Sequence, residues 1–121
     1  MKVSFIGLGV MGFPMAGHLK NAGFDVTVFN RTHAKALSWA EQYQGQAAET
    51  VADCVADADV VVTMLPAAAH VKSLYLGENG IIQASRSDVL FIDSSTIDAD
   101  SARVVGKAVE QSGRLFVDAP V

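Results

Sequence analysis

The stretch KVSFIGLGVMGFPMAGHLKNAGFDVTVFNRT, residues 2–32, decides the fold. An apolar run leads into glycines at G-x-G-x-x-G spacing, a segment with helical spacing of apolar residues follows, and then comes a second apolar run. In this strand–turn–helix–strand context, the glycine pattern predicts a turn that binds the phosphates of a dinucleotide. Gly7 allows the tight turn, Gly9 lets the backbone approach a pyrophosphate, and Gly12 lets the helix pack close to the strand. The alternative is a purely structural turn.

Strand and helix patterns alternate along the rest of the chain. The predicted strands are 2–6, 25–29, 46–49, 59–64, 88–92 and 114–118. The predicted helices are 10–22, 33–43, 50–57 and 99–112, the second capped by Thr32 and the fourth by Asp98. Nearly continuous apolar runs are typical of strands buried on both faces of a parallel sheet. The alternation therefore predicts an α/β fold, a Rossmann-type, doubly wound and mostly parallel sheet, in a single domain of residues 1–121.

The Rossmann strand order also predicts where a ligand would bind. In the order 3-2-1-4-5-6, strands 1 and 4 flank the point at which the ligand crevice opens. The strand ending at Met64 is the fourth in this order, so we expect Met64-Leu65-Pro66 to face the glycine turn across the ligand.

The composition suits one globular domain and argues against several classes of partner. Half of the 121 residues are hydrophobic, the net charge is −4 and the sequence pI is about 5.1. An acidic balance without basic runs argues against nucleic acid and against an anionic membrane surface, and no apolar stretch reaches the roughly 18 residues of a membrane span. Cys54 has no cysteine partner and the histidines share no metal-ligand spacing. We therefore expect no metal and a reducing, cytoplasmic location.

The residues after the second apolar run bear on the choice of cofactor. An Asp or Glu there would bind the ribose hydroxyls of NAD, and it would repel a 2′-phosphate. The sequence instead has Asn30-Arg31-Thr32. The Arg31 guanidinium can clamp a 2′-phosphate with charge-assisted hydrogen bonds, and its neighbours can add neutral ones, so we expect NADP to be favoured over NAD. The alternative is that Arg31 stacks on adenine or lies in solvent and NAD is used.

A cluster of hydroxyl groups follows the fifth predicted strand, in FIDSSTID, residues 91–98. Ser94, Ser95 and Thr96 come at the carboxyl end of that strand, where open α/β sheets bind their ligands. There they can hold a carboxylate or the nicotinamide amide. A local explanation is equally good, because hydroxyls and Asp98 are also typical of the cap of the next helix.

Five stretches together resemble a known family. FIGLGVMGFPMAGHL, FNRT, MLPAAAHVKSLYLGENGI, IDSSTID and FVDAPV occur in the order found in the N-terminal domain of the β-hydroxyacid dehydrogenases, and they cover essentially the whole chain. Members of that family transfer hydride between NAD(P) and the alcohol of a small 3-hydroxy acid. The third stretch is most similar to the 3-hydroxyisobutyrate dehydrogenases, which favours 3-hydroxyisobutyrate and methylmalonate semialdehyde as the substrate pair. Tartronate semialdehyde and succinic semialdehyde reductases are the sister activities.

The resemblance also implies roles for individual residues. It implies cofactor contacts for Gly7, Leu8, Gly9, Val10, Met11, Gly12, Asn30, Arg31, Thr32, Leu65, Pro66, His70 and Thr96. It implies substrate contacts for Ser95 and Thr96.

Other parts of the family pattern have no match in these residues. The family motif DAPVSGG is matched only as far as DAPV, and the catalytic lysine of the family lies on a later helix, so we expect it beyond Val121. The helical second domain, which completes the substrate cleft and the family's dimer, is also unmatched. We therefore expect a fragment of a longer enzyme, with no catalytic residue and no turnover of its own. The alternative is a non-catalytic dinucleotide-binding module.

Overall fold

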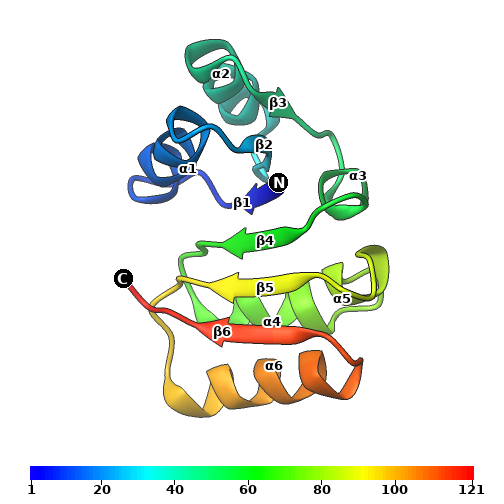
Figure 1. Cartoon of the computed structure of the whole chain (residues 1–121). Helices are drawn as coiled ribbons and strands as arrows, with labels where there is room; N and C mark the ends of the chain where they lie inside the picture. Colours follow the sequence, from blue (N-terminus) through cyan, green and yellow to red (C-terminus); the bar gives the residue numbers. More distant parts are fainter.

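Six strands form one sheet in the order β3-β2-β1-β4-β5-β6, and all neighbouring strands are parallel. The structure, a computed structural model, describes residues 1–121. The strands are β1 (Lys2–Ile6), β2 (Asp25–Phe29), β3 (Gln46–Ala47), β4 (Val60–Thr63), β5 (Leu90–Asp93) and β6 (Leu115–Asp118). Figure 1 shows β3 toward one edge of the sheet and β6 at the other. The predicted fold class and strand order are confirmed.

Helices cover both faces of this sheet. They are α1 (Gly12–Asn21), α2 (His33–Tyr43), α3 (Val51–Val55), α4 (Ala68–Leu76), α5 (Ile81–Ala84) and α6 (Ala99–Gln111). One core contains the buried residues of α1 and α2, including Trp39, and the other contains those of α3 to α6, including Tyr75. In β4, Val61 belongs to the second core and Val62 to the first, as expected for successive residues of a strand. None of the helices has the length and apolar character that crossing a bilayer requires.

The two cores meet at the central strands, β1 and β4. Because α1 follows β1 and α4 follows β4, the chain leaves these neighbouring strands toward opposite faces, which opens a crevice at their carboxyl ends. Ile6 is in register with Thr63. The glycine turn and the segment that begins at Met64 therefore leave the sheet side by side, as the strand order predicted.

Several elements differ in extent from the prediction for local reasons. The third strand is short because Thr50 already caps α3, its hydroxyl accepting the Asp53 N–H at 3.1 Å. The fifth strand begins at Leu90 rather than at residue 88, because the Asp88 carboxylate is engaged by Arg86 in the preceding turn. The helix predicted from residue 10 begins at Gly12, and no bounds were predicted for the helices α4 and α5.

The two predicted helix caps have different outcomes. Asp98 caps α6 as predicted, with Oδ2 accepting the Ser101 N–H at 3.0 Å. Thr32 occupies the N-cap position of α2 in extended backbone geometry, but its hydroxyl accepts no N–H from the helix. The predicted side-chain cap by Thr32 is therefore wrong, although the helix bounds 33–43 are confirmed.

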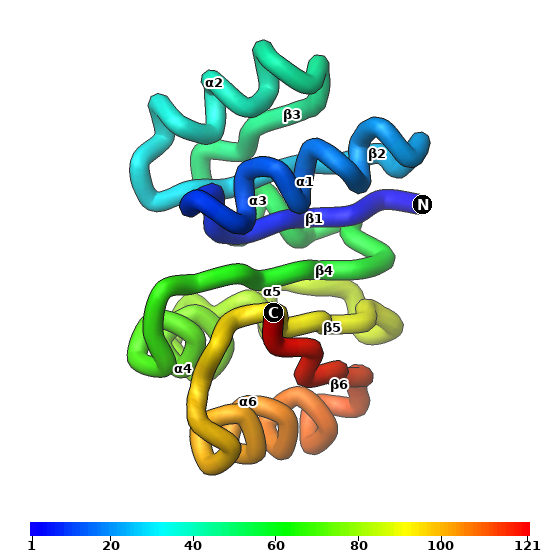
Figure 2. Tube along the Cα trace, turned by 90° about the vertical axis from the view of Figure 1, so that its left-hand side faces the viewer, coloured from blue at the N-terminus to red at the C-terminus, as the bar shows by residue number.

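The end of the chain lies beside the segment that follows β5. In Figure 2 the red C-terminal end lies against the yellow to orange segment between β5 and α6. The Val121 N–H donates to the Ser94 carbonyl oxygen at 3.3 Å, and the Thr96 hydroxyl donates to the Val121 carbonyl oxygen at 3.1 Å. Backbone contacts therefore hold residues 119–121 against the carboxyl end of the sheet.

The buried thiol of Cys54 gives a test of this packing. Burial raises the pKa of Cys54 from its ordinary value of 9.0 to about 12. The unfolded chain therefore releases this proton at a lower pH than the folded one, and the contribution of Cys54 to stability falls as pH rises from about 9 to about 12. We expect the free energy of unfolding to drop more steeply over this range in the wild type than in Cys54→Ala, measured by urea denaturation. Parallel curves for the two proteins would contradict the buried placement.

Candidate functional site

The turn between β1 and α1 borders the site, and two of its glycines are required by contacts within the protein. Gly7 has a φ of 104°, and a Cβ on it would collide with the Met64 carbonyl oxygen. A Cβ on Gly12 would collide with the Gly7 carbonyl oxygen and lie 3.3 Å from Phe5 Cε1. The first glycine thus brings the turn against the end of β4, and the second brings α1 against β1. These are the reasons that the sequence pattern predicted.

Gly9 differs from Gly7 and Gly12, because no contact within the protein requires a glycine there. A Cβ on Gly9 would meet no atom within 4 Å, and its φ lies outside the left-handed region. The backbone of the neighbouring residues is also open, with Val10 91% exposed. Any requirement for glycine at this position must therefore come from a bound molecule rather than from the fold.

The backbone N–H groups of the turn divide into two sets. Gly7 N–H donates to the Phe29 carbonyl oxygen at 3.1 Å, and Leu8 N–H donates to Asn30 Oδ1 at 3.0 Å. The N–H groups that donate to no protein atom are those of Gly9, Val10, Met11 and Gly12. They lie at the N-terminus of α1, where the helix dipole adds partial positive charge. Such a group of unpaired donors is suited to an anion, above all a phosphate.

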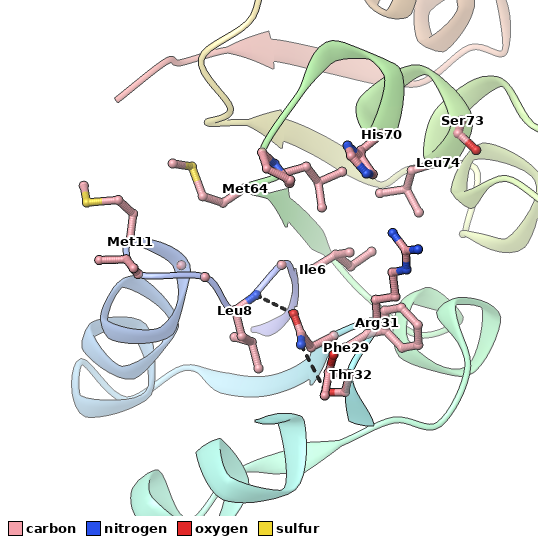
Figure 3. Close-up of a pocket in the computed structure, with 17 residues that line it drawn as sticks. Ile6, Leu8, Met11, Phe29, Arg31, Thr32, Met64, His70, Ser73 and Leu74 are labelled. Atoms are coloured by element: carbon pink, nitrogen blue, oxygen red, sulfur yellow. Dashed lines mark hydrogen bonds between the residues drawn. The ribbon is translucent and has the colours of Figure 1, made fainter. Parts of the chain in front are cut away.

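Asn30 links the glycine turn to the loop after β2. Its side-chain oxygen accepts the Leu8 N–H, and its Nδ2 donates to the Thr32 carbonyl oxygen at 3.1 Å (Figure 3). The amide thus holds the loop that carries Arg31 at a set distance from the turn. The sequence predicted Asn30 only as a cofactor contact, and this bracing role appears only in the structure.

A single pocket brings most of the predicted site residues together. It has a volume of about 710 Å³ and is enclosed by the glycine turn, the loop after β2 and the segment from the end of β4 into α4 (Figure 3). Its predicted lining residues are Gly7, Leu8, Gly9, Val10, Met11, Gly12, Asn30, Arg31, Thr32, Leu65, Pro66 and His70. A volume of this size is in the usual range for a small-molecule or cofactor site.

The charges around the pocket favour an anionic ligand. None of its 17 lining residues carries a carboxylate. Arg31 forms no salt bridge or hydrogen bond within the protein, so its guanidinium is free to pair with a ligand. Figure 3 shows the Arg31 guanidinium and the His70 imidazole extending from opposite walls toward the same part of the pocket. The exposed hydroxyls of Thr32 and Ser73 add neutral hydrogen-bonding groups nearby.

Two predicted residues, Ser95 and Thr96, do not line this pocket. Ser95 is fully buried, and its Oγ accepts the Leu65 N–H at 2.8 Å and donates to Asp93 Oδ1 at 2.7 Å. Thr96 is exposed, and its hydroxyl bonds to the carbonyl oxygen of Val121. Both lie at the carboxyl end of β5, one strand away from the Met64-Leu65-Pro66 segment. Their contacts with cofactor or substrate stay predictions.

Four lining residues were not predicted, namely Ile6, Phe29, Ser73 and Leu74, whereas Met64 lines the pocket beside Leu65 and Pro66 as the strand order predicted. The first two are the last residues of β1 and β2. Their position at strand ends that meet at the crevice was a usable signal. Ser73 and Leu74 lie on α4, whose bounds were not predicted, so nothing in the sequence pattern directed these two residues toward the pocket.

Unpaired N–H groups at a glycine turn, placed at the switch point of a doubly wound sheet, define the class of dinucleotide-binding domains. Residues 2–121 match the family described as the NAD binding domain of 6-phosphogluconate dehydrogenase. The chain belongs to this family, which includes the β-hydroxyacid dehydrogenases, and the resemblance found in the sequence is confirmed.

Several proteins similar to the chain are dehydrogenases. The 3-hydroxyisobutyrate dehydrogenase of Pseudomonas aeruginosa is 43% identical over 98% of the chain and 40% of its own length. A Mycobacterium tuberculosis 3-hydroxyisobutyrate dehydrogenase solved with L-serine has a TM-score of 0.91 and 40% identity over 99% of the chain and 40% of its own. Psf3, solved with NADP⁺ and 2-OPP, has a TM-score of 0.91 and 26% identity, covering 98% of this chain and 42% of its own. The chain thus spans about 40% of the length of the proteins it matches.

Proposed function

We propose that this chain is the NADP-binding domain of a β-hydroxyacid dehydrogenase. The observation that carries the proposal is the pocket, in which unpaired N–H groups and an unpaired arginine face one space that no carboxylate enters. The comparison with Psf3, which was solved with NADP⁺, supports the choice of cofactor.

The geometry suggests a direction for the bound dinucleotide. The pyrophosphate would lie on the N–H groups at the start of α1, against the open backbone of Gly9. The adenosine end would lie toward Arg31 and Thr32, where the guanidinium pairs with the 2′-phosphate. The other end would then run along Leu65 and Pro66, toward the carboxyl end of β5 and the hydroxyls of Ser95 and Thr96.

We further propose that the whole enzyme acts on a small 3-hydroxy acid. The bound nicotinamide would supply the hydride chemistry at the substrate alcohol. The similarity to two 3-hydroxyisobutyrate dehydrogenases favours 3-hydroxyisobutyrate, and the one solved with L-serine points to the same chemical group. Both compounds carry a hydroxymethyl group on the carbon that bears the carboxylate. The substrate class is thus a short carboxylate with a terminal hydroxymethyl group.

The residues of this chain would bind and orient the cofactor without handling the substrate proton. Neither a lysine nor a carboxylate lines the pocket, and its one histidine, His70, lies on an exposed part of α4. A general acid must be within hydrogen-bond reach of the oxygen that it protonates. We therefore assign the proton transfer to a part of the whole enzyme that corresponds to the remaining length of its relatives.

A binding experiment with the 121-residue chain tests the proposal. We expect NADPH to bind with a stoichiometry of one and to raise the free energy of unfolding by about 2.7 kcal/mol at a ligand concentration 100 times Kd. We expect no hydride transfer to methylmalonate semialdehyde, measured by loss of NADPH absorbance. Calorimetry and thermal unfolding with NADPH, NADH and ATP measure the first expectation, and ATP is the control for a general phosphate site. Equal binding of ATP and NADPH, or turnover by the chain alone, would contradict the proposal.

A further inference from the structure

A cluster of polar side chains lies buried where β4 and β5 end, next to the pocket but outside its lining. Thr63, Asp93 and Ser95 have no exposed surface, and Tyr75 is 2% exposed. Thr63 and Asp93 are register partners on the neighbouring strands β4 and β5. Tyr75 comes from α4, so the cluster joins a helix to two strands. Hydrogen bonds within a buried polar cluster of this kind make the surrounding core rigid and favour one arrangement of it.

The hydrogen bonds of the cluster converge on one oxygen atom. Asp93 Oδ1 accepts from Thr63 Oγ1 at 2.8 Å, from Ser95 Oγ at 2.7 Å and from the Ser95 N–H at 3.3 Å. The other carboxylate oxygen, Oδ2, has no partner. The structural role of Asp93 therefore depends on a single acceptor atom.

The direction of each bond follows from the number of protons available. Thr63 has one hydroxyl proton and gives it to Asp93, so in the 2.9 Å contact between Thr63 Oγ1 and the Tyr75 hydroxyl the tyrosine is the donor. Burial raises the pKa of Tyr75 and keeps that proton in place. Ser95 likewise gives its proton to Asp93, which leaves its oxygen free to accept the Leu65 N–H at 2.8 Å. Thr63 and Ser95 thus both donate to Asp93, whereas Tyr75 donates to Thr63 and the Leu65 N–H donates to Ser95.

Both ends of the cluster reach walls of the pocket. Leu65 lines the pocket and borders the glycine turn, since a Cβ on Gly7 would lie 3.1 Å from Leu65 Cδ2. Tyr75 directly follows Ser73 and Leu74, which line the pocket from α4. The Asp93 Oδ1 atom is therefore connected by hydrogen bonds both to the backbone after β4 and to α4.

We infer that Asp93 is a positioning residue for the dinucleotide, acting through Ser95 on Leu65 and through Thr63 and Tyr75 on α4. The inference rests on the proposed function, because it needs the pocket to hold the dinucleotide. Asp93 itself lines no part of the pocket. Without its acceptor oxygen, the Ser95 and Thr63 hydroxyls reorient, the Leu65 N–H loses its aligned partner, and the two walls no longer match the ligand.

The test measures NADPH affinity of the whole chain, without substrate, in four variants. Asp93→Ala removes the acceptor, Asp93→Asn keeps an oxygen at the Oδ1 position, Ser95→Ala breaks the link to Leu65, and Asp93→Ala/Ser95→Ala removes both. The matched control is Ser101→Ala, which deletes another buried hydroxyl, bonded at 2.7 Å to Asp98 Oδ1 at the N-terminus of α6 and outside the pocket lining. Circular dichroism and urea unfolding are recorded for each protein, and binding is measured at a temperature at which each is folded.

We expect Asp93→Ala and Ser95→Ala each to raise the Kd for NADPH by about tenfold, and the double variant to raise it by no more than the larger single effect, because the two residues act in one chain. Asp93→Asn should stay within about threefold of the wild type, since one acceptor atom is all that the cluster uses. Ser101→Ala should lose stability and keep the wild-type Kd. If Asp93→Ala does not fold, the comparison of Ser95→Ala with Ser101→Ala decides the question.

Three outcomes would overturn the inference. Wild-type affinity in Ser95→Ala or in folded Asp93→Ala would show that the cluster only stabilises the fold. If the increase in Kd for the double variant equals the product of the two single increases, Asp93 and Ser95 act separately. If the wild-type protein binds no NADPH, the proposed function is overturned as well. If Arg31 variants lose affinity for NADPH but the Asp93 and Ser95 variants do not, the proposed function stands and this inference fails.

Discussion

Replacing Gly9 by alanine is expected to leave the domain folded and to weaken dinucleotide binding by at least about tenfold. The added methyl group meets no protein atom within 4 Å, and the backbone at Gly9 needs no left-handed geometry, so the fold tolerates it. The same methyl would stand where the proposed pyrophosphate approaches the turn. Forcing a methyl group into a close contact costs about 1–3 kcal/mol, and about 1.4 kcal/mol is already tenfold in Kd.

Gly7→Ala is the matched variant with the opposite expected result. Its Cβ would collide with the Met64 carbonyl oxygen at a φ of 104°. The left-handed backbone and the overlap together cost about 2–5 kcal/mol, a large part of the stability of a small domain. We therefore expect a lower urea midpoint for Gly7→Ala and a wild-type midpoint for Gly9→Ala.

Urea unfolding and NADPH titration of both variants separate the two roles of the turn. Wild-type affinity in Gly9→Ala would show that the pyrophosphate does not lie on this part of the turn. Unchanged stability in Gly7→Ala would contradict the close approach of the turn to β4.

Arg31→Ala is expected to weaken NADPH binding by about 10- to 100-fold and to change NADH binding by less than about threefold. The guanidinium has no salt-bridge partner in the protein and lies in a pocket without carboxylates, so the 2′-phosphate is the charge it would pair with. Removing it then leaves two phosphate charges without a cation. NADH lacks this phosphate and should be indifferent to the change.

Two further variants and a salt series sharpen this prediction. Arg31→Lys should bind NADPH with intermediate affinity, because an ammonium cannot form the bidentate pair. Lys107→Ala removes an exposed cation on α6, outside the pocket, and controls for the change in net charge. The loss in Arg31→Ala should shrink as salt rises, because Arg31 is exposed and its interaction is screened. An equal loss for NADPH and NADH would show that Arg31 does not bind the 2′-phosphate.

Much of the fold could be predicted because its signals are local. The strands at 2–6 and 25–29 and the helix at 33–43 have the predicted bounds, since apolar runs and helical spacing are properties of short segments. The bounds of α4 were not predicted because its sequence, AAHVKSLYL, has no side-chain cap and only Val71 and Tyr75 buried, so its pattern is weak. Its existence depends on packing against the sheet and α6 rather than on its own residues.

The candidate site could be predicted only as far as its residues are neighbours in the chain or belong to a known motif. Gly7, Gly9 and Gly12 have separable roles that their spacing already implies. Ser73 and Leu74 reach the pocket only because α4 packs beside the turn. Ser95 was predicted as a substrate contact, and the structure adds its bond to the Leu65 N–H, thirty residues away in sequence.

The sequence by itself determined the glycine turn and the basic residue that follows β2, because each of these rests on residue types within a short stretch. It also determined the order of strands, through the alternation of strand and helix patterns along the whole chain. Only the tertiary structure decided which hydroxyl groups form hydrogen bonds within the protein and which remain available to a ligand. The register of β4 against β5 places Thr63 beside Asp93, and the packing of α4 brings Tyr75 to both. Hydrogen-bond partners far apart in the chain are set by the pairing of strands and the docking of helices, which no local pattern records.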